Sequence, residues 1–341
     1  MKTLKLPKQR LDFFASVLQQ FGEVHGPVAR NGGFVFDRLR RWSDARLDYT
    51  RTLLPPRKYF LPPNQTLYSL RRDGHAVLPP AQGPSSMVLF GVHACDIHGL
   101  NILDKVFGEP FPDPYYRERR SSIALIGIDC VPDEHCFCHS MRADFVDHGF
   151  DLFLYDIGEY YLTLVSSARG DDMVLATGGL FEPVLRSDEE EFKRRSTAKD
   201  QAFQLEVEIR DMSQIFEMEY DSHIWDELGD RCLACGACSL VCPTCYCFDV
   251  VDQVPFGEGD VRRLRCWDSC MFPMHAEVAG GENFRADRSS RVKFRFYHKQ
   301  RGFVAEYGRP SCVGCGRCIT ACPVGIDIVR VLERLRGVAH A

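Results

Sequence analysis

The sequence predicts an α+β protein, in which an N-terminal α/β domain with a mixed sheet precedes a largely helical, cysteine-rich domain. Short, continuous apolar runs alternate with a helical pattern in the first half of the chain. A run of mixed charge at 186–195 then marks a change in composition. Beyond it, two four-cysteine runs dominate the sequence. Alternating strands and helices followed by a separate segment of another kind are typical of two domains.

An amphipathic helix is predicted over residues 8–20, because apolar side chains recur there every three or four positions. These side chains are Leu11, Phe14, Val17, Leu18 and Phe21. Residues 23–39, interrupted by Asn31-Gly32-Gly33, predict a hairpin.

Two apolar runs, 87–92 and 122–128, predict strands that are buried on both faces of a parallel sheet. A helical pattern at 97–107 lies between them. Cys95 and Cys130 follow the two runs directly. Ligands gather beyond the carboxyl ends of parallel strands, so both cysteines are expected at that edge of the sheet.

Cys136 and Cys138 lie on the loop that leaves the second of these strands. Together with Cys95 and Cys130, they are predicted to bind an iron–sulfur cluster, the third of the chain after the two considered below. The alternative is that Cys95 and Cys130 are buried small hydrophobic residues. His93, His98, His135 and His139 also occur in these loops. Both metal ligation and ordinary hydrogen bonding stay open for them.

Further strands are predicted at 151–155 and 160–165, and the charge run predicts an exposed helix at about 188–209. This helix is taken as a boundary between domains, with no functional role. The predicted division is an α/β domain at 1–185, a charged helical linker at 186–230, and a cysteine-rich domain at 231–341 with an insert at 243–311.

The two cysteine runs share the spacing Cys-x2-Cys-x2-Cys-x3-Cys-Pro. In two-cluster ferredoxins, three cysteines of each run hold one 4Fe-4S cluster and the fourth holds the other cluster. The sequence therefore predicts a two-cluster ferredoxin-type domain. Its ligands are Cys232, Cys235, Cys238 and Cys242 in the first run, and Cys312, Cys315, Cys318 and Cys322 in the second. Zinc or a disulfide scaffold is the alternative, but zinc sites do not need two complete runs that each end in Cys-Pro.

The insert between the runs carries four more cysteines, namely Cys245, Cys247, Cys266 and Cys270. They are candidate ligands of a fourth cluster, which would use all 16 cysteines of the chain. Otherwise, Cys245 and Cys247 pack beside the first cluster or contribute ligands to another site.

Residues 285–301 contain seven Lys or Arg and one acid, Asp287, with aromatic residues interleaved. The alternation at 291–297 predicts a strand whose cations stabilise anionic clusters nearby. Binding of single-stranded nucleic acid is the alternative. Residues 326–335 predict a closing helix.

Composition indicates an ordinary globular protein, with 341 residues, 26% charged residues and a net charge of −5. The negative charge argues against a nucleic-acid partner. No apolar run has the length of a signal-peptide core or a membrane span, so a soluble, cytoplasmic protein with no membrane partner is expected. Sixteen cysteines in a reducing compartment indicate metal binding.

Motifs for binding nucleotides are absent from the sequence. There is no Gly-x-Gly-x-x-Gly after a strand and no Walker loop, so no nucleotide or flavin site is expected. No nucleophile and base can be linked into a catalytic set either. Clusters without a substrate site predict an electron-transfer subunit that is not catalytic alone and that needs partners at both ends.

Six motifs together resemble the beta subunit of soluble sulfhydrogenases, which are cytosolic nickel–iron hydrogenases, and the related iron–sulfur subunit of anaerobic sulfite reductase. The motifs are Gly91–Asp96, Cys136–Met141, Cys242–Phe248, Trp267–Cys270, Ala279–Arg285 and Cys312–Cys318. The resemblance spans about residues 55–330. It implies that the eight ferredoxin cysteines are ligands, and it strengthens the third cluster. Cys266 is not part of the family pattern.

The resemblance also implies an iron–sulfur subunit that relays electrons between a catalytic subunit and a FAD- and NAD(P)H-binding subunit. The expected catalytic partner is a nickel–iron hydrogenase with its small and large subunits. One alternative is the same relay in an anaerobic sulfite reductase, or in a flavin oxidoreductase complex linked to heterodisulfide reductase. Another is a self-standing iron–sulfur reductase of a sulfur compound, with its site among Cys95, Cys130, Cys136 and Cys138.

Overall fold

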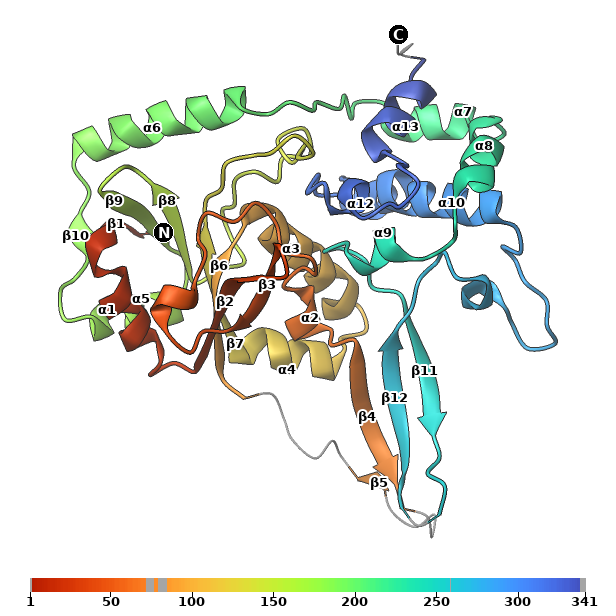
Figure 1. Ribbon diagram of the computed structural model, residues 1–341, viewed down its shortest axis with the longest axis horizontal. Helices are drawn as coiled ribbons and strands as arrows, with labels where there is room; N and C mark the ends of the chain where they lie inside the picture. Colours follow the sequence, from red (N-terminus) through yellow and green to blue (C-terminus); the bar gives the residue numbers. More distant parts are fainter. Residues whose placement is uncertain (1, 72–76, 79–84, 258, 338–341) are drawn as a thin grey trace. The chain divides into compact units, whose positions relative to one another are not determined.

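The computed structural model describes residues 2–71, 77–78, 85–257 and 259–337, and Figure 1 shows its ribbon. The chain forms two compact units. The first comprises residues 1–56, 85–207 and 313–316, and the second comprises 57–84, 208–312 and 317–341. Each unit therefore combines segments that are far apart in the sequence.

The first unit is built on an eight-stranded sheet with the order β10-β1-β9-β8-β7-β6-β2-β3. Its strands are β1 (Lys2–Pro7), β2 (Glu23–Arg30), β3 (Gly33–Arg38), β6 (Met87–Val92), β7 (Ile123–Ile128), β8 (Leu152–Asp156), β9 (Tyr160–Val165) and β10 (Glu182–Pro183). The run β2-β6-β7-β8 is parallel, and the other pairs are antiparallel. The predicted mixed sheet and the hairpin at 23–39 are confirmed.

Strands β6 and β7 lie inside this sheet and carry the core. All six residues of β7 are buried, as expected of a parallel strand that is covered on both faces. Gly127 of β7 permits close packing, because a Cβ there would lie 2.2 Å from Cδ2 of Phe153. Phe14 and Phe90 are fully buried, and their ring centroids lie 6.4 Å apart in an edge-on arrangement.

The helices of the first unit are η1 (Lys8–Arg10), α1 (Leu11–Leu18), η2 (Trp42–Asp44), α3 (Ala94–Gly108), α4 (Pro114–Ser122), α5 (Ala168–Ala176) and α6 (Arg186–Gln201). Helix α6 is the predicted charged helix, but it ends at Gln201 and not near residue 209. The N–H of Ala202 bonds to the carbonyl of Lys199 at 3.1 Å, which closes the last turn. The N–H of Val207 then bonds to Oγ of Ser140 at 2.9 Å, so this backbone group is satisfied outside a helix.

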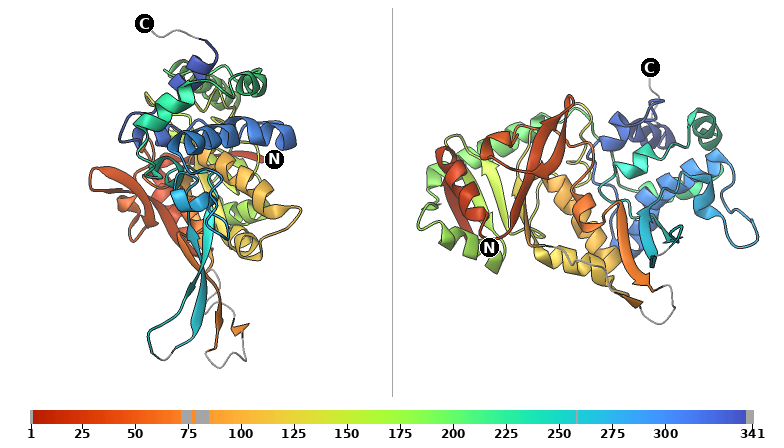
Figure 2. Two further views of the ribbon diagram at one scale, coloured as in Figure 1. Left: turned by 90° about the vertical axis from the view of Figure 1, so that its right-hand side faces the viewer. Right: turned by 60° about the horizontal axis from the view of Figure 1, so that its bottom comes forward.

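The second unit contains a four-stranded antiparallel sheet with the order β11-β12-β4-β5. Its strands are β4 (Asn64–Leu70), β5 (Val77–Leu78), β11 (Phe248–Gln253) and β12 (Val261–Trp267). Figures 1 and 2 show β4 beside the β11–β12 hairpin. Arg265 donates a hydrogen bond of 2.6 Å to Gln65 across this pairing. This pairing places β4 and β5 in the second unit, so the compact units differ from the contiguous division predicted from the sequence.

The helices of the second unit are α2 (Arg57–Phe60), α7 (Met212–Met218), α8 (Ile224–Arg231), α9 (Ala237–Leu240), η3 (Pro273–Ala276), α10 (Arg288–Tyr297), the π-helix η4 (His298–Gly302), α11 (Phe303–Tyr307), α12 (Arg317–Thr320) and α13 (Ile328–Leu335). The closing helix predicted at 326–335 is confirmed as α13. None of the helices within the described ranges has the length and apolar character needed to cross a membrane.

The strand predicted at 291–297 is wrong, because this segment is part of helix α10. Val292 and Phe296 are both buried and lie one helical turn apart, and the Phe296 ring centroid lies 5.9 Å from that of Trp225 of α8. Asp287 caps the helix by accepting a 2.7 Å bond from the N–H of Ser290. The apolar residues of this segment fit the i, i+4 spacing of a helix face as well as the alternation of a strand. Packing of α10 against α8 selects the helix.

Candidate metal centres

Three of the four predicted N-terminal ligands lie together at one edge of the eight-stranded sheet. Cys130 follows β7, and the loop beyond it carries Cys136 and Cys138, which are buried. The Cys138 thiol lies within the electrostatic influence of Cys130 and Cys136. Cys95 lies in the first turn of α3, after β6, and β6 pairs in parallel with β7. Burial as small hydrophobic residues does not by itself explain why these thiols gather at one sheet edge.

Lys199 of α6 supplies a buried positive charge to this group. Its Nζ donates to Oδ1 of Asp129 at 2.5 Å and to the carbonyl of Asp144 at 2.8 Å. Burial opposes its charge, but the charges of Asp129 and Cys130 outweigh that effect and raise the pKa of Lys199. Burial raises the pKa of the Cys130 thiol to about 12. A cation fixed beside these thiols would favour the thiolate form that metal binding requires.

The loop that carries Cys136 is braced from two sides. The Asp133 carboxylate accepts a hydrogen bond from the N–H of Cys136 at 3.1 Å and pairs with Arg51. Arg51 also lies 3.8 Å from Sγ of Cys136. On the other side, the N–H of Phe137 donates to the carbonyl of Gly314 at 2.9 Å. Segment 313–316 of the last cysteine run thus packs on this loop within the first unit.

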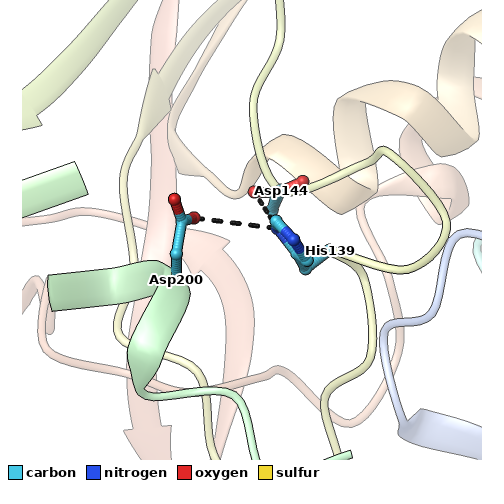
Figure 3. A group of neighbouring side chains, drawn as sticks. All are labelled: His139, Asp144 and Asp200. Carbon is cyan, nitrogen blue, oxygen red and sulfur yellow. Dashed lines mark hydrogen bonds and ion pairs between the residues drawn. The ribbon is translucent and has the colours of Figure 1, made fainter. Parts of the chain in front are cut away.

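Histidine and carboxylate side chains near this loop form a second group, drawn in Figure 3. Nδ1 of His139 lies 3.3 Å from Oδ2 of Asp144 and 3.7 Å from Oδ1 of Asp200. The three donor atoms are close enough for one metal ion, but His139 and Asp200 are exposed to solvent. Their contacts tie the last turn of α6 to the loop after Cys138. Nearby, Nε2 of His98 bonds to the carbonyl of Phe145 at 2.6 Å, an ordinary structural role.

In the second unit, one cavity brings together cysteines from both ferredoxin runs. The cysteines that line it are Cys232, Cys235, Cys238, Cys318 and Cys322. Three come from the first run, and Cys318 and Cys322 are the third and fourth cysteines of the other run. This is the crossing that a two-cluster ferredoxin requires. Cys235 is exposed, whereas the other four are at least partly buried.

Backbone N–H groups donate hydrogen bonds to two sulfur atoms of the first predicted quartet, which consists of Cys232, Cys235, Cys238 and Cys322. The N–H of Ala234 lies 3.3 Å from Sγ of Cys232, and the N–H of Ile326 lies 3.2 Å from Sγ of Cys322. Gly236 has a φ of +75°, and a Cβ there would lie 2.6 Å from Phe272. Such N–H···S bonds stabilise thiolate charge and tune the potential of a bound cluster.

Arg295 of α10 places a buried guanidinium in the wall of the same cavity. Its Nη2 donates to the carbonyl of Cys238 at 3.2 Å. Burial opposes its charge, but the thiols of Cys238 and Cys318 outweigh that effect and raise the pKa of Arg295. The expectation that residues 285–301 supply cations to the clusters is consistent with this position, although the segment is helical.

The second predicted quartet consists of Cys312, Cys315, Cys318 and Cys242. Cys315 belongs to the first unit, and the other three belong to the second. This ligand set therefore stays a prediction from the cysteine spacing.

The four remaining cysteines separate into two groups. Cys245 lies within the electrostatic influence of Cys242, and Cys270 lies within that of Cys247. Cys245, Cys247 and Cys270 line one cavity. Cys266 lies within β12, opposite Asp249 of β11, and is not among the residues that line that cavity.

Two residues near these sites were missed in the sequence. Lys199 belongs to the charge run that predicted only an exposed helix, yet it is the buried residue of α6. No periodic apolar signal marks it, because its neighbours in the helix are polar. His275 lies beside Cys247, and its position five residues after Cys270 was an available signal.

Comparison with known proteins gives two matches. Residues 231–326 match the family model of a 4Fe-4S dicluster domain. Over 336 residues, the chain is 38% identical to sulfhydrogenase 2 subunit beta from Pyrococcus furiosus, and the alignment covers 98% of this chain and 99% of that protein.

Proposed function

The chain belongs to the family of sulfhydrogenase beta subunits, as its motifs predicted, and we propose that it is the iron–sulfur electron-transfer subunit of a cytoplasmic oxidoreductase complex. In this proposal it relays electrons between a nickel–iron hydrogenase of small and large subunits and a FAD- and NAD(P)H-binding subunit. The observation that carries the proposal is the cavity shared by Cys232, Cys235, Cys238 and Cys322.

The donor set of this cavity fits a 4Fe-4S cluster. Four thiols from two distant runs converge, backbone N–H groups donate to two of the sulfurs, and Arg295 offsets negative charge. A bound cluster supplies reversible one-electron transfer. The role of the chain is to hold the thiolates, to exclude water on the Arg295 side, and to set the potential through hydrogen bonds and charge.

The proposal includes two further clusters. From the spacing of the two cysteine runs, Cys312, Cys315, Cys318 and Cys242 would hold the second cluster. A third would bind at the sheet edge through Cys95, Cys130, Cys136 and Cys138, where Lys199 and Arg51 supply positive charge. This arrangement assigns twelve of the 16 cysteines.

The test is a ligand substitution in the assembled complex. Cys322→Ser should abolish hydrogen turnover linked to NAD(P)H, because it removes a ligand of the first cluster. The hydrogenase subunits should stay active with an artificial dye. Cys266→Ser is the matched control and should keep linked turnover, since Cys266 lies within β12. Linked turnover that survives in Cys322→Ser would overturn the relay role.

Partner identity has its own measurement, which is anaerobic purification followed by identification of the attached subunits. Nickel–iron and flavin subunits are the expected result. A sirohaem or heterodisulfide-reductase partner would leave the relay in place but would change the chemistry at its far end.

One observation favours a second candidate function, a reductase of a sulfur compound. A cavity of about 560 Å³ beside Cys130 is lined by Tyr161 and by two ion pairs, Lys199 with Asp129 and Arg195 with Asp156, so it is large enough to admit a small sulfur compound next to the third predicted cluster. This function predicts that the cluster spectrum of the isolated subunit changes when polysulfide is added. An unchanged spectrum would exclude it.

A further inference from the structure

A cavity of about 260 Å³ in the second unit gathers metal-binding side chains that the two ferredoxin quartets do not use. Its donors are Cys245, Cys247, Cys270 and His275, and a second imidazole, that of His298, also lines it, packed against the rings of Phe294 and Tyr246. The β11–β12 pairing closes this site, because Phe248 is opposite Trp267 at the ends of the two strands. The N–H of Asp268 then bonds to the carbonyl of Cys247 at 3.1 Å. Residues on either side of the hairpin are thereby brought together.

These donors face a common space and interact electrostatically. The Cys247 thiol lies within the electrostatic influence of Cys270 and His275, and Cys245 lies within that of Cys270. Three thiols and an imidazole thus converge without Cys266, which the sequence had placed in this set.

His275 is oriented as metal-binding histidines are. Its Nδ1 hydrogen-bonds with the carboxylate of Asp268, which leaves Nε2 as the ring nitrogen that can bind a metal. A carboxylate on the other ring nitrogen fixes the tautomer and the ring direction of a ligating histidine. Asp268 and His275 are each mostly buried, with side-chain exposures of 17% and 18%.

Two buried cations in the wall indicate that the occupant is an anion. Lys299 and Arg295 both line the cavity, and they are 3% and 6% exposed. Among the described residues, Nζ of Lys299 donates to the carbonyl and the hydroxyl of Thr244, at 3.0 and 2.8 Å. Nε of Arg295 is buried without a hydrogen-bond partner. No carboxylate in the described part of the chain forms an ion pair with either cation, so cysteines are their counter-charges: Cys238 and Cys318 for Arg295, and Cys242 and Cys245 for Lys299. Of these, Cys245 belongs to this cavity, and buried charges need such partners.

We propose that Cys245, Cys247, Cys270 and His275 bind an additional iron–sulfur cluster through three thiolates and one imidazole. A single zinc ion does not fit this geometry. Zinc places its ligand atoms within about 2.3 Å of the metal, so those atoms must lie close to one another. Among the described residues, the group whose donor atoms all lie within 4.8 Å of one another is His139, Asp144 and Asp200. The present four donors are more widely spread, as are those of the first ferredoxin quartet. A cluster spans that spread, and with three thiolates it is anionic, as Lys299 and Arg295 require.

The additional site adjoins the first ferredoxin cavity. Arg295 lines both cavities, and Cys270 lies within the electrostatic influence of Cys238. A cluster held there extends the row of redox centres in the second unit. The role of this site in electron transfer rests on the proposed function. The metal site itself is inferred from the cavity and its donors, independently of that function.

The experiment measures iron and acid-labile sulfide per chain in the complete, anaerobically purified complex. Cys247→Ser should lose about four iron and four sulfide relative to the wild type. Cys266→Ser, also a cysteine of the insert, should lose none. Equal iron contents in the two variants would overturn the proposal, and so would zinc that is bound in the wild type and lost in Cys247→Ser without loss of iron.

A second measurement covers the case in which Cys247→Ser disturbs folding. Pulsed electron paramagnetic resonance of the reduced wild-type complex, with ¹⁵N-labelled histidine, should detect nitrogen coupled to a cluster. His275→Cys should keep the iron content and lose this coupling. A wild type without histidine coupling refutes the imidazole ligand whether or not linked turnover is retained, so this failure is distinct from failure of the relay role in Cys322→Ser.

Discussion

Lys199→Met tests whether a buried ion pair holds α6 on the sheet. Lys199 is the buried residue of this 16-residue helix, and its Nζ bonds to Asp129 at 2.5 Å and to the carbonyl of Asp144 at 2.8 Å. Methionine keeps an apolar stem of similar length but cannot donate or carry charge. Asp129 would then be left at the sheet edge without its partner.

The expected cost follows from the exposure of the remaining carboxylate. Breaking a buried ion pair costs about 3–5 kcal/mol, because one charge is left uncompensated. The Asp129 side chain is 22% exposed, so water and protonation relieve part of this cost. We therefore expect about 3 kcal/mol, the lower end of that range. Since about 1.4 kcal/mol corresponds to a factor of ten, α6 should open about 150-fold more often.

The assay is native-state amide hydrogen exchange across residues 186–201. Lys193→Met is the matched control, because Lys193 is exposed in the same helix and should leave protection unchanged. Adding Asp129→Asn to Lys199→Met should restore part of the protection, since no unpaired charge then remains. Protection in Lys199→Met equal to that in Lys193→Met would refute the role given to the ion pair.

Two further predictions concern the loop that carries Cys136. Gly308 and Gly314 have similar positive φ values of +68° and +66°, but a Cβ at Gly308 meets nothing within 4 Å, whereas one at Gly314 would lie 2.5 Å from the carbonyl of Phe137. Gly314→Ala should therefore cost about 1–3 kcal/mol more than Gly308→Ala in urea unfolding, and equal costs would contradict the close packing. For Asp133, burial disfavours the charge, but the bond from the N–H of His135 and the charge of Arg51 outweigh it and lower the pKa below its ordinary value of 3.8. When the pKa of a carboxyl is lower in the folded state, its ionisation stabilises the protein at pH values above the pKa of the unfolded state. This stabilisation is lost as the pH falls through the pKa of the folded state. The difference in urea midpoint between wild type and Asp133→Asn should accordingly shrink from pH 6 to pH 3, and a difference that stays constant would argue against this account.

Local patterns were sufficient for much of the fold. The strands at 87–92 and 122–128 were predictable because buried parallel strands are continuously apolar. The hairpin at 23–39 was predictable because Asn31-Gly32-Gly33 marks a turn between two strands that are adjacent along the chain. The segment 291–297 was not predictable, since its pattern fits both the strand period and the helix period. The helix is selected by packing of α10 on α8, where Phe296 lies against Trp225.

Pairing between distant segments was also beyond the sequence. Strand β4 joins β12 across a long stretch of chain, and no residue in 64–70 identifies that partner. Long-range pairing depends on which alternative buries the most surface at the least entropic cost, and that is a property of the whole chain.

The sequence by itself determined the cysteine runs, because a cluster ligand set is written in short spacings that local loops can realise. It also determined the family, through six motifs in order. Only the tertiary structure decided which residues complete each site. His275 and not Cys266 lies beside Cys247, and Lys199 reaches Asp129 from a helix that is otherwise mostly polar. These contacts join residues that are distant along the chain, so packing, and not spacing, determines them.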